Sequence, residues 1–195
     1  MTNVSPGIML VDDHPERSQQ VCERLRAAGY TVLANINSAE GLLFQVEKYR
    51  PDVVLIDIES PDRDILESLA IVNREAPTPV AMFSSRCNAE FISRAVESGV
   101  SAYMVEGITA ERVAPAIEIA MAQFKNFQQL RKSLERTKQQ LTDRKTIERA
   151  KGLLMAKKKL NEEDAHKILR NLAMSTNSTI RTVAEQIIHH FQSEQ

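Results

Sequence analysis

The sequence predicts a doubly wound α/β domain followed by a small all-α domain. Short apolar runs alternate with amphipathic stretches over about the first 110 residues, a pattern typical of a parallel sheet covered by helices on both faces. This alternation ends near Thr109, and no glycine occurs from there to Asp143. The charge balance also changes sign along the chain. We therefore expect two domains of different architecture, joined by a helical connector.

The elements of the front domain follow from hydrophobic periodicity. Five apolar runs predict strands at residues 8–11, 30–34, 53–56, 80–83 and 102–105. Amphipathic stretches between them predict helices at residues 16–28, 38–49, 63–75 and 88–98, with a fifth beginning near Thr109. Gly29 and Gly99 are placed to end helices, while Pro51, Pro77 and Pro79 precede strands. The expected sheet has the flavodoxin-like strand order.

Composition excludes several classes of protein. The chain has 195 residues, of which 43% are hydrophobic and 26% charged, so it is neither mainly disordered nor fibrous. No apolar run is long enough to span a membrane, and the first residues lack a secretion signal, so we expect a cytoplasmic protein without membrane contact. Cys22 and Cys87 fall in separate predicted helices and are expected to be reduced thiols. The four histidines lack zinc-ligand spacing.

The two halves of the chain carry opposite charge. Up to Pro115 there are 10 Lys/Arg and 17 Asp/Glu, and after it there are 15 and 9. Residues 125–159 hold 12 Lys/Arg against three acids. A basic rear half predicts contact with a polyanion, and a merely solvated helical face is the alternative.

Three aspartates fall at one edge of the predicted sheet. Asp12 and Asp13 end the first strand, and Asp57 ends the third. These strands flank the switch point of the flavodoxin-like order, where such sheets bind ligands. Clustered carboxylates favour a hard cation such as Mg²⁺, and one of them could accept a phosphoryl group. The alternative is three solvated loop acids.

Residues 6–120 resemble the CheY-like receiver domains of two-component response regulators. The resemblance rests on Asp12-Asp13, Asp57 in DIESP, Ser84, and Tyr103 in GVSAY. It implies that the three aspartates hold Mg²⁺, that Asp57 is the phosphoacceptor, and that Ser84 and Tyr103 are switch residues. At the place of the family's lysine stands Glu106, which would add negative charge beside a phosphoaspartate. We therefore expect the receiver fold to serve as a docking surface for a sensor protein, with phosphorylation of Asp57 as the alternative.

The connector, residues 121–143, predicts a dimeric coiled coil. Apolar residues recur every seven positions at Ala120, Phe127, Leu134 and Leu141. The companion core positions are basic, which weakens the pattern, and a lone amphipathic helix is the alternative. We expect Phe127, Leu134 and Leu141 to join two chains.

Residues 144–195 predict a three-helix domain. Its expected helices are 145–157, 161–174 and 179–191, with Leu154, Met155, Leu169 and Met174 in the core. The segments ERAKGLLM, LNEEDAHKILRNLAM and TIRTVAEQII resemble the ANTAR family over residues 143–190. This resemblance implies binding to paired hairpins in a nascent leader RNA, which prevents terminator formation. The candidate RNA contacts are Arg149, Lys151, Lys158, His166, Arg170 and Arg181.

The combination of receiver, coiled coil and ANTAR domains resembles the antitermination regulators of the AmiR and NasT type. This implies a non-enzymatic regulator controlled by a cytoplasmic ligand-sensing protein related to periplasmic binding proteins, with nitrate or nitrite assimilation as the pathway. The alternative function is a phosphorylation-activated, DNA-binding response regulator.

Overall fold

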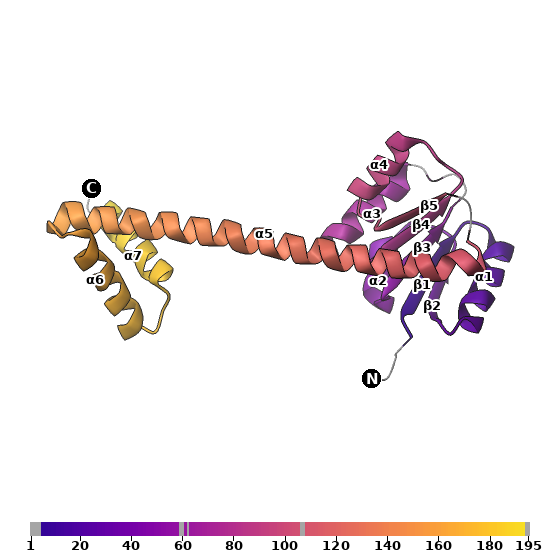
Figure 1. The fold of residues 1–195 in the computed structure, drawn as a ribbon, viewed down its shortest axis with the longest axis horizontal. Helices are drawn as coiled ribbons and strands as arrows, with labels where there is room; N and C mark the ends of the chain where they lie inside the picture. The colour runs from indigo at the N-terminus through magenta and orange to yellow at the C-terminus, as the bar shows by residue number, and fades with distance from the viewer. Residues whose placement is uncertain (1–4, 59–60, 62, 106–107, 194–195) are drawn as a thin grey trace. The chain divides into compact units, whose positions relative to one another are not determined.

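The computed structural model describes residues 5–193, except 59–60, 62 and 106–107. The chain divides into two compact units, Met1–Gln128 and Gln129–Gln195. The first is an α/β unit and the second is entirely helical in its described part (Figure 1). The predicted fold class is confirmed.

The sheet of the first unit has five parallel strands in the order β2-β1-β3-β4-β5, as predicted. The strands are β1 (Gly7–Asp12), β2 (Thr31–Ile36), β3 (Val53–Asp57), β4 (Val80–Ser84) and β5 (Ala102–Val105). The helices that follow them are α1 (Pro15–Ala27), α2 (Leu42–Tyr49), α3 (Arg63–Glu75), α4 (Ala89–Glu97) and α5 (Ala110–Lys158).

Most boundaries agree with the predicted ones to within one to four residues. Helix α2 begins at Leu42 rather than near residue 38, because Gly41 precedes it in the left-handed conformation with φ of 66°. Cys87 is exposed in the segment between β4 and α4, outside the helix in which it was expected. Cys22 is buried in α1.

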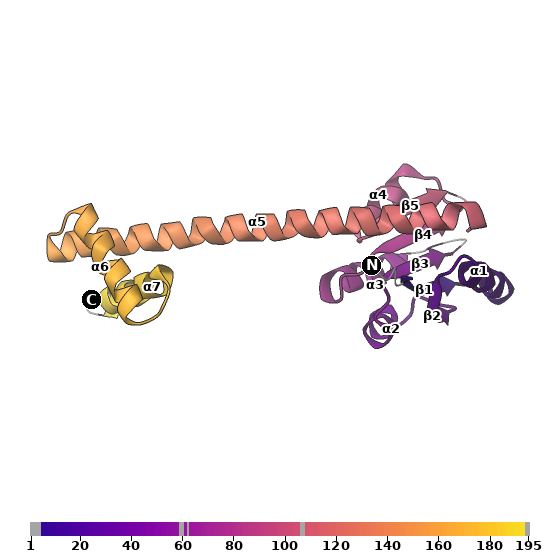
Figure 2. The ribbon, with the colours of Figure 1, turned by 60° about the horizontal axis from the view of Figure 1, so that its bottom comes forward.

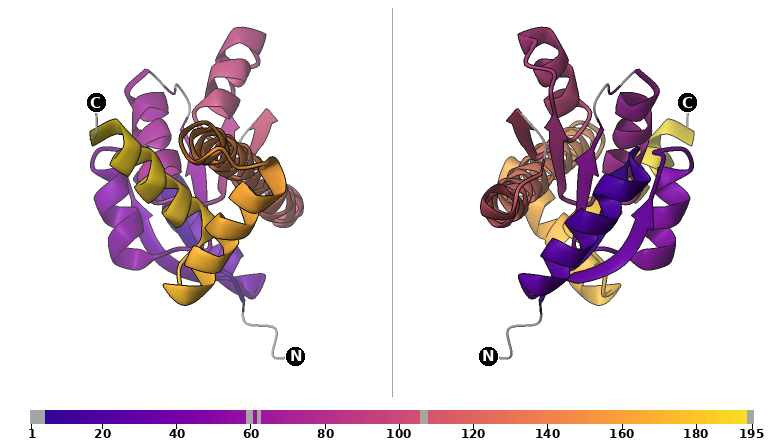
Figure 3. Two further views of the ribbon diagram at one scale, coloured as in Figure 1. Left: turned by 90° about the vertical axis from the view of Figure 1, so that its left-hand side faces the viewer. Right: turned by 90° about the vertical axis from the view of Figure 1, so that its right-hand side faces the viewer.

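Helices cover both faces of the sheet (Figure 3). On one face α2, α3 and α4 pack on side chains such as Met9, Ile56 and Met82. On the other face α1 and the first part of α5 pack on Leu10, Leu55 and Phe83. Figure 2 shows this part of α5 lying along the sheet. Alternate residues of each central strand point to opposite faces, so the apolar residues of β1, β3 and β4 are buried on both sides of the sheet.

Helix α5 is a single helix of 49 residues. Residues 145–157, expected as a separate first helix of the rear domain, form its last part. No glycine or proline occurs between Pro115 and Gly152, so the sequence contains no residue that would end the helix there.

The second unit packs the end of α5 against α6 (Glu162–Ser175) and α7 (Ile180–Ser193). Its buried core consists of Ala150, Leu154, Ala165, Leu169, Ala173, Val183 and Ala184. Leu154 and Leu169 are buried as predicted, whereas Met155 and Met174 are exposed, by 38% and 71%. Met155 and Met174 directly follow the core residues Leu154 and Ala173, so each lies about 100° around its helix from the buried stripe.

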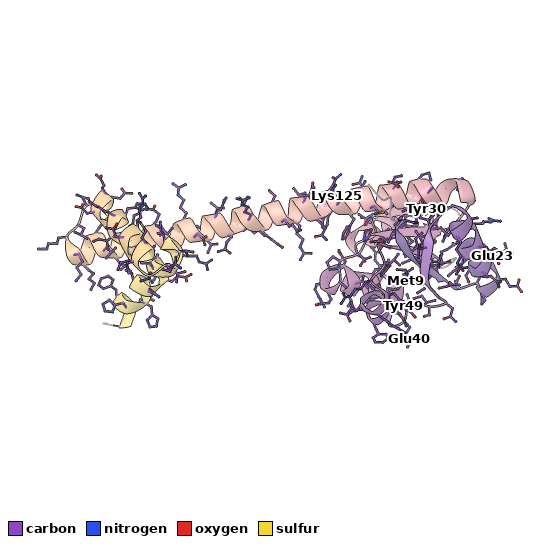
Figure 4. The ribbon with its side chains drawn as sticks, turned by 90° about the horizontal axis from the view of Figure 1, so that it is seen from below. Met9, Glu23, Tyr30, Glu40, Tyr49 and Lys125 are labelled. Atoms are coloured by element: carbon purple, nitrogen blue, oxygen red, sulfur yellow. The ribbon has the colours of Figure 1, made fainter. Side chains whose placement is uncertain are left out.

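Figure 4 shows the side chains of both units. Met9 lies in the interior of the first unit, whereas Glu23, Glu40 and Lys125 are exposed. Among the described helices, none has an apolar stretch of the length needed to cross a bilayer.

Candidate functional sites: an acidic pocket and a helical face

The register of the sheet brings the predicted acidic residues together. Asp12 and Asp57 are direct partners in the ladder between β1 and β3. Both are the last residues of their strands, and both are almost fully buried, with exposures of 1% and 2%. Asp13 follows Asp12 and remains 37% exposed through its side chain. The three aspartates therefore form one acidic pocket at the carboxyl edge of the sheet.

A residue that the sequence did not single out, Arg17, lies in the middle of this pocket. Its Nη2 donates to Oδ1 of Asp12 at 2.9 Å and to Oδ1 of Asp13 at 3.2 Å. The same nitrogen donates to the backbone carbonyl of Asp57 at 3.0 Å, and Nε lies 3.5 Å from Oδ2 of Asp57. One guanidinium thus contacts all three aspartates. The four-residue separation from Asp13 at a helix start was the available sequence clue.

The turn from β1 into α1 fixes the direction of Arg17. The backbone N–H of His14 donates to Oδ1 of Asp12 at 2.8 Å, which closes the turn, and Pro15 begins the helix. His14 also lies against Asp13, with 2.7 Å between Nδ1 and Oδ1. The first turn of α1 therefore places Arg17 over the ends of β1 and β3.

Burial and the charge of Arg17 change the pKa of Asp57 in opposite directions. Burial raises the pKa of its carboxyl group, and the nearby Arg17 guanidinium offsets part of this increase. The backbone N–H of Ile108 also points to Oδ2 of Asp57, at 3.4 Å. The pKa of Arg17 is raised, chiefly by its hydrogen bond to Asp12. Glu106, the predicted departure from the receiver pattern, lies outside the described residues.

The two other switch-like residues lie on neighbouring strands. Ser84 is buried at the end of β4, and its Oγ accepts from the backbone N–H of Arg86 at 3.2 Å. Tyr103 on β5 is half-buried, and its hydroxyl donates to the carbonyl of Arg86 at 2.9 Å. Its ring meets that of Phe91 edge-on, with centroids 6.3 Å apart. Ser84 and Tyr103 are thus both tied to the segment after β4.

In the second unit, two predicted RNA contacts share one face of a helix. His166 and Arg170 are exposed and lie four residues apart on α6, with the exposed Met174 four residues further on. We call His166, Arg170 and Met174 the α6 face. It presents an imidazole ring, a guanidinium group and a thioether at successive turns of the helix. Arg149 and Lys158, also exposed, lie on α5.

The two remaining candidates are engaged in ion pairs. Lys151 is buried, and its Nζ lies 2.9 Å from Glu148 and 2.7 Å from Glu162. Arg181 pairs with Asp143 at 3.1 Å and with Glu185 at 2.9 Å. Lys151 therefore joins α5 to α6 within the domain, a role that its sequence position did not indicate.

The residues predicted to form a dimer seam are exposed on α5. Phe127, Leu134 and Leu141 have exposures of 54%, 53% and 56%. Leu130 is 69% exposed. These residues constitute an apolar stripe on the connector, exposed in the single chain.

Comparison with protein families matches residues 8–118 to the response regulator receiver domain. Residues 135–188 match the ANTAR domain, which begins inside the segment predicted as connector. The chain is 27% identical over 181 residues to the transcriptional regulatory protein PdtaR of Mycobacterium tuberculosis, covering 93% of this chain and 88% of PdtaR.

Other relatives match a smaller share of the chain. It is 30% identical over 117 residues to the positive alginate biosynthesis regulatory protein of Pseudomonas aeruginosa, covering 58% of this chain and 46% of that protein. A solved structure, the signal receiver domain of a modulated diguanylate cyclase from Desulfovibrio desulfuricans, superposes with a TM-score of 0.55 at 24% identity. It covers 63% of this chain and 98% of its own, which shows the receiver fold.

Proposed function

Because the chain belongs to the response regulators and joins a receiver domain to an ANTAR domain, we propose that it regulates transcription by antitermination. In this proposal the ANTAR domain binds paired hairpins in a nascent leader RNA and prevents the terminator from forming. The relative that spans most of the chain, PdtaR, is named as a transcriptional regulatory protein, which supports a regulatory function.

The α6 face is the observation that carries the RNA-binding proposal. An exposed imidazole is suited to stack on an unpaired loop base, and an exposed guanidinium to bind phosphate. His166 and Arg170 offer both at one helix spacing, on a helix whose adjacent face is held in the core by Ala165 and Leu169. A fixed helix presenting these groups fits a hairpin loop. Arg149 and Lys158 are proposed to contribute further phosphate contacts.

The proposal includes the partners that the family resemblance implies. The protein acts as a homodimer joined through Phe127, Leu134 and Leu141 of α5. A cytoplasmic ligand-sensing protein related to periplasmic binding proteins controls it, and nitrate or nitrite is the signal. The receiver domain serves as the docking surface for this sensor, and the protein acts in the cytoplasm.

The test is filter binding of the full chain to the leader transcript of its own operon, at several salt concentrations. Binding through phosphates predicts that log affinity falls linearly with log salt, by about 0.7 per phosphate contact on single strands. Arg170→Ala should weaken binding and reduce this slope. His166→Ala should cost about 1–3 kcal/mol, the value of one stacked base, with the slope nearly unchanged.

Lys125→Ala is the matched control, because Lys125 is exposed on α5 but belongs to the first unit. It should bind RNA like the parent. Duplex DNA is the competing ligand, since a DNA-binding response regulator is the alternative function. Equal affinity for duplex DNA and a two-hairpin RNA would refute the proposal, as would parental binding by both α6 variants.

A further inference from the structure

We infer that Arg17 is a built-in cation of the acidic pocket and excludes the Mg²⁺ ion that receiver domains hold there. The inference concerns the occupant of the pocket and is independent of RNA binding. The oxygen ligands of the pocket are of the type that Mg²⁺ selects, but the Arg17 guanidinium already contacts them.

The guanidinium contacts oxygens of all three aspartates that a metal would use. Oδ1 of Asp12 accepts from Nη2 of Arg17 and from the backbone N–H of His14, while Oδ2 accepts from Nε of Arg17 at 3.2 Å. Both oxygens of this buried carboxylate therefore have donors. Nη2 also holds Oδ1 of Asp13 and the carbonyl of Asp57. The four contacts converge on one planar group.

Mg²⁺ and the Arg17 guanidinium would compete for the same pocket. Mg²⁺ requires oxygen ligands at about 2.0–2.1 Å in near-octahedral arrangement. An ion bound to the same oxygens of Asp12, Asp13 and Asp57 would lie within about 6 Å of the guanidinium, because Arg17 nitrogens are within 3.5 Å of each aspartate. Two positive charges that close repel one another, so the metal enters only if Arg17 leaves.

The pocket is built to retain Arg17. Its side chain is 35% exposed, and it bonds to the ends of two separate strands, β1 and β3. The arginine comes from the first turn of α1, a helix packed on the sheet through Val21, Cys22 and Leu25. A planar fork with several donors suits this multiple contact better than an ammonium group would. Arg17 thus neutralises part of the charge without a diffusible ion.

The test is a titration of the full chain with Mn²⁺, a paramagnetic substitute for Mg²⁺, followed by electron paramagnetic resonance of the free ion. Wild type should bind weakly, and Arg17→Ala should bind roughly tenfold or more tightly, because a neighbouring positive charge is removed. Asp57→Asn added to Arg17→Ala should abolish the gain. Arg24→Ala is the control, since Arg24 is an exposed cation on the same helix. It should behave as wild type.

A second measurement protects the test against a misfolded variant. Thermal unfolding of wild type should be insensitive to millimolar Mg²⁺, and the less disruptive Arg17→Gln should gain melting temperature as Mg²⁺ is added. Wild type that binds Mn²⁺ as tightly as Arg17→Ala would overturn the inference. So would a folded Arg17→Gln whose melting temperature ignores Mg²⁺.

Discussion

Lys151 shows how a basic residue in a basic segment can have a structural task. Its ammonium group bridges Glu148, on its own helix, and Glu162, in the first turn of α6. Hydrogen bonding to Lys151 lowers the pKa of Glu162, and the same bond raises the pKa of Lys151. The pair therefore stabilises the folded second unit over the range in which both groups are charged.

We predict that Glu162→Gln lowers the melting temperature of the second unit at neutral pH. Because the folded pKa of Glu162 is depressed, its contribution is complete above the unfolded pKa and is lost as the pH falls through the folded one. The difference from wild type should therefore vanish in acid. Circular dichroism melts from pH 3 to 8 measure this. Glu163→Gln removes a charge from the same first turn but leaves the Lys151–Glu162 pair, so it should lower the melting temperature less; a pH-independent difference for Glu162→Gln would contradict the prediction.

Residue identities predicted the acidic pocket but not its cation. Asp12, Asp13 and Asp57 were found because residues at the carboxyl ends of neighbouring parallel strands meet at one edge. Arg17 was missed because a helix-surface arginine looks the same in sequence whether it faces solvent or turns back over a strand end. Met174 was wrongly expected in the core for a related reason: helical periodicity does not show whether a residue beside the buried stripe is itself buried or exposed.

At the scale of elements, the cap of α6 can be tested separately. The side chain of Asn161 accepts from the backbone N–H of Asp164 at 2.8 Å. Asn161→Ala should destabilise the second unit by about 1 kcal/mol, because the first turn then lacks this acceptor. Asn171→Ala, an exposed position within α6, is the control and should not destabilise. Chemical denaturation of both variants measures the difference, and equal midpoints would show that the cap contributes nothing.

Helix α5 carries the apolar stripe expected to join two chains. We predict that Leu134→Glu dissociates the dimer, because it places a charge in an apolar seam. Gln129→Glu is the control: it adds the same charge at an exposed position, about 140° around the helix from Leu134. Analytical ultracentrifugation at several concentrations distinguishes the two. A Leu134→Glu protein that sediments as a dimer would place the interface elsewhere.

At the scale of the whole molecule, the sequence predicted the order of the strands but not the continuity of helix α5. The strand order followed from strict alternation and from the aspartates at the strand ends. The separate helix expected at residues 145–157 was wrong because α5 runs through both units, and a segment without glycine or proline carries no helix boundary in its sequence. Only packing shows where one core ends and the next begins.

The acidic pocket also determines whether phosphorylation of Asp57 can act as the signal for RNA binding. Phosphorylation of Asp57 would add about two negative charges beside Asp12 and Asp13, in a chain that has Glu106 in place of the family's lysine and whose Arg17 is inferred to exclude Mg²⁺. We therefore expect acetyl phosphate with Mg²⁺ to leave Asp57 of wild type largely unmodified and the affinity for leader RNA unchanged. Intact-protein mass spectrometry and filter binding on one sample measure both, with Asp57→Asn as the blank. Stoichiometric modification of Asp57 accompanied by a large gain in RNA affinity would show instead that this receiver is switched by phosphorylation.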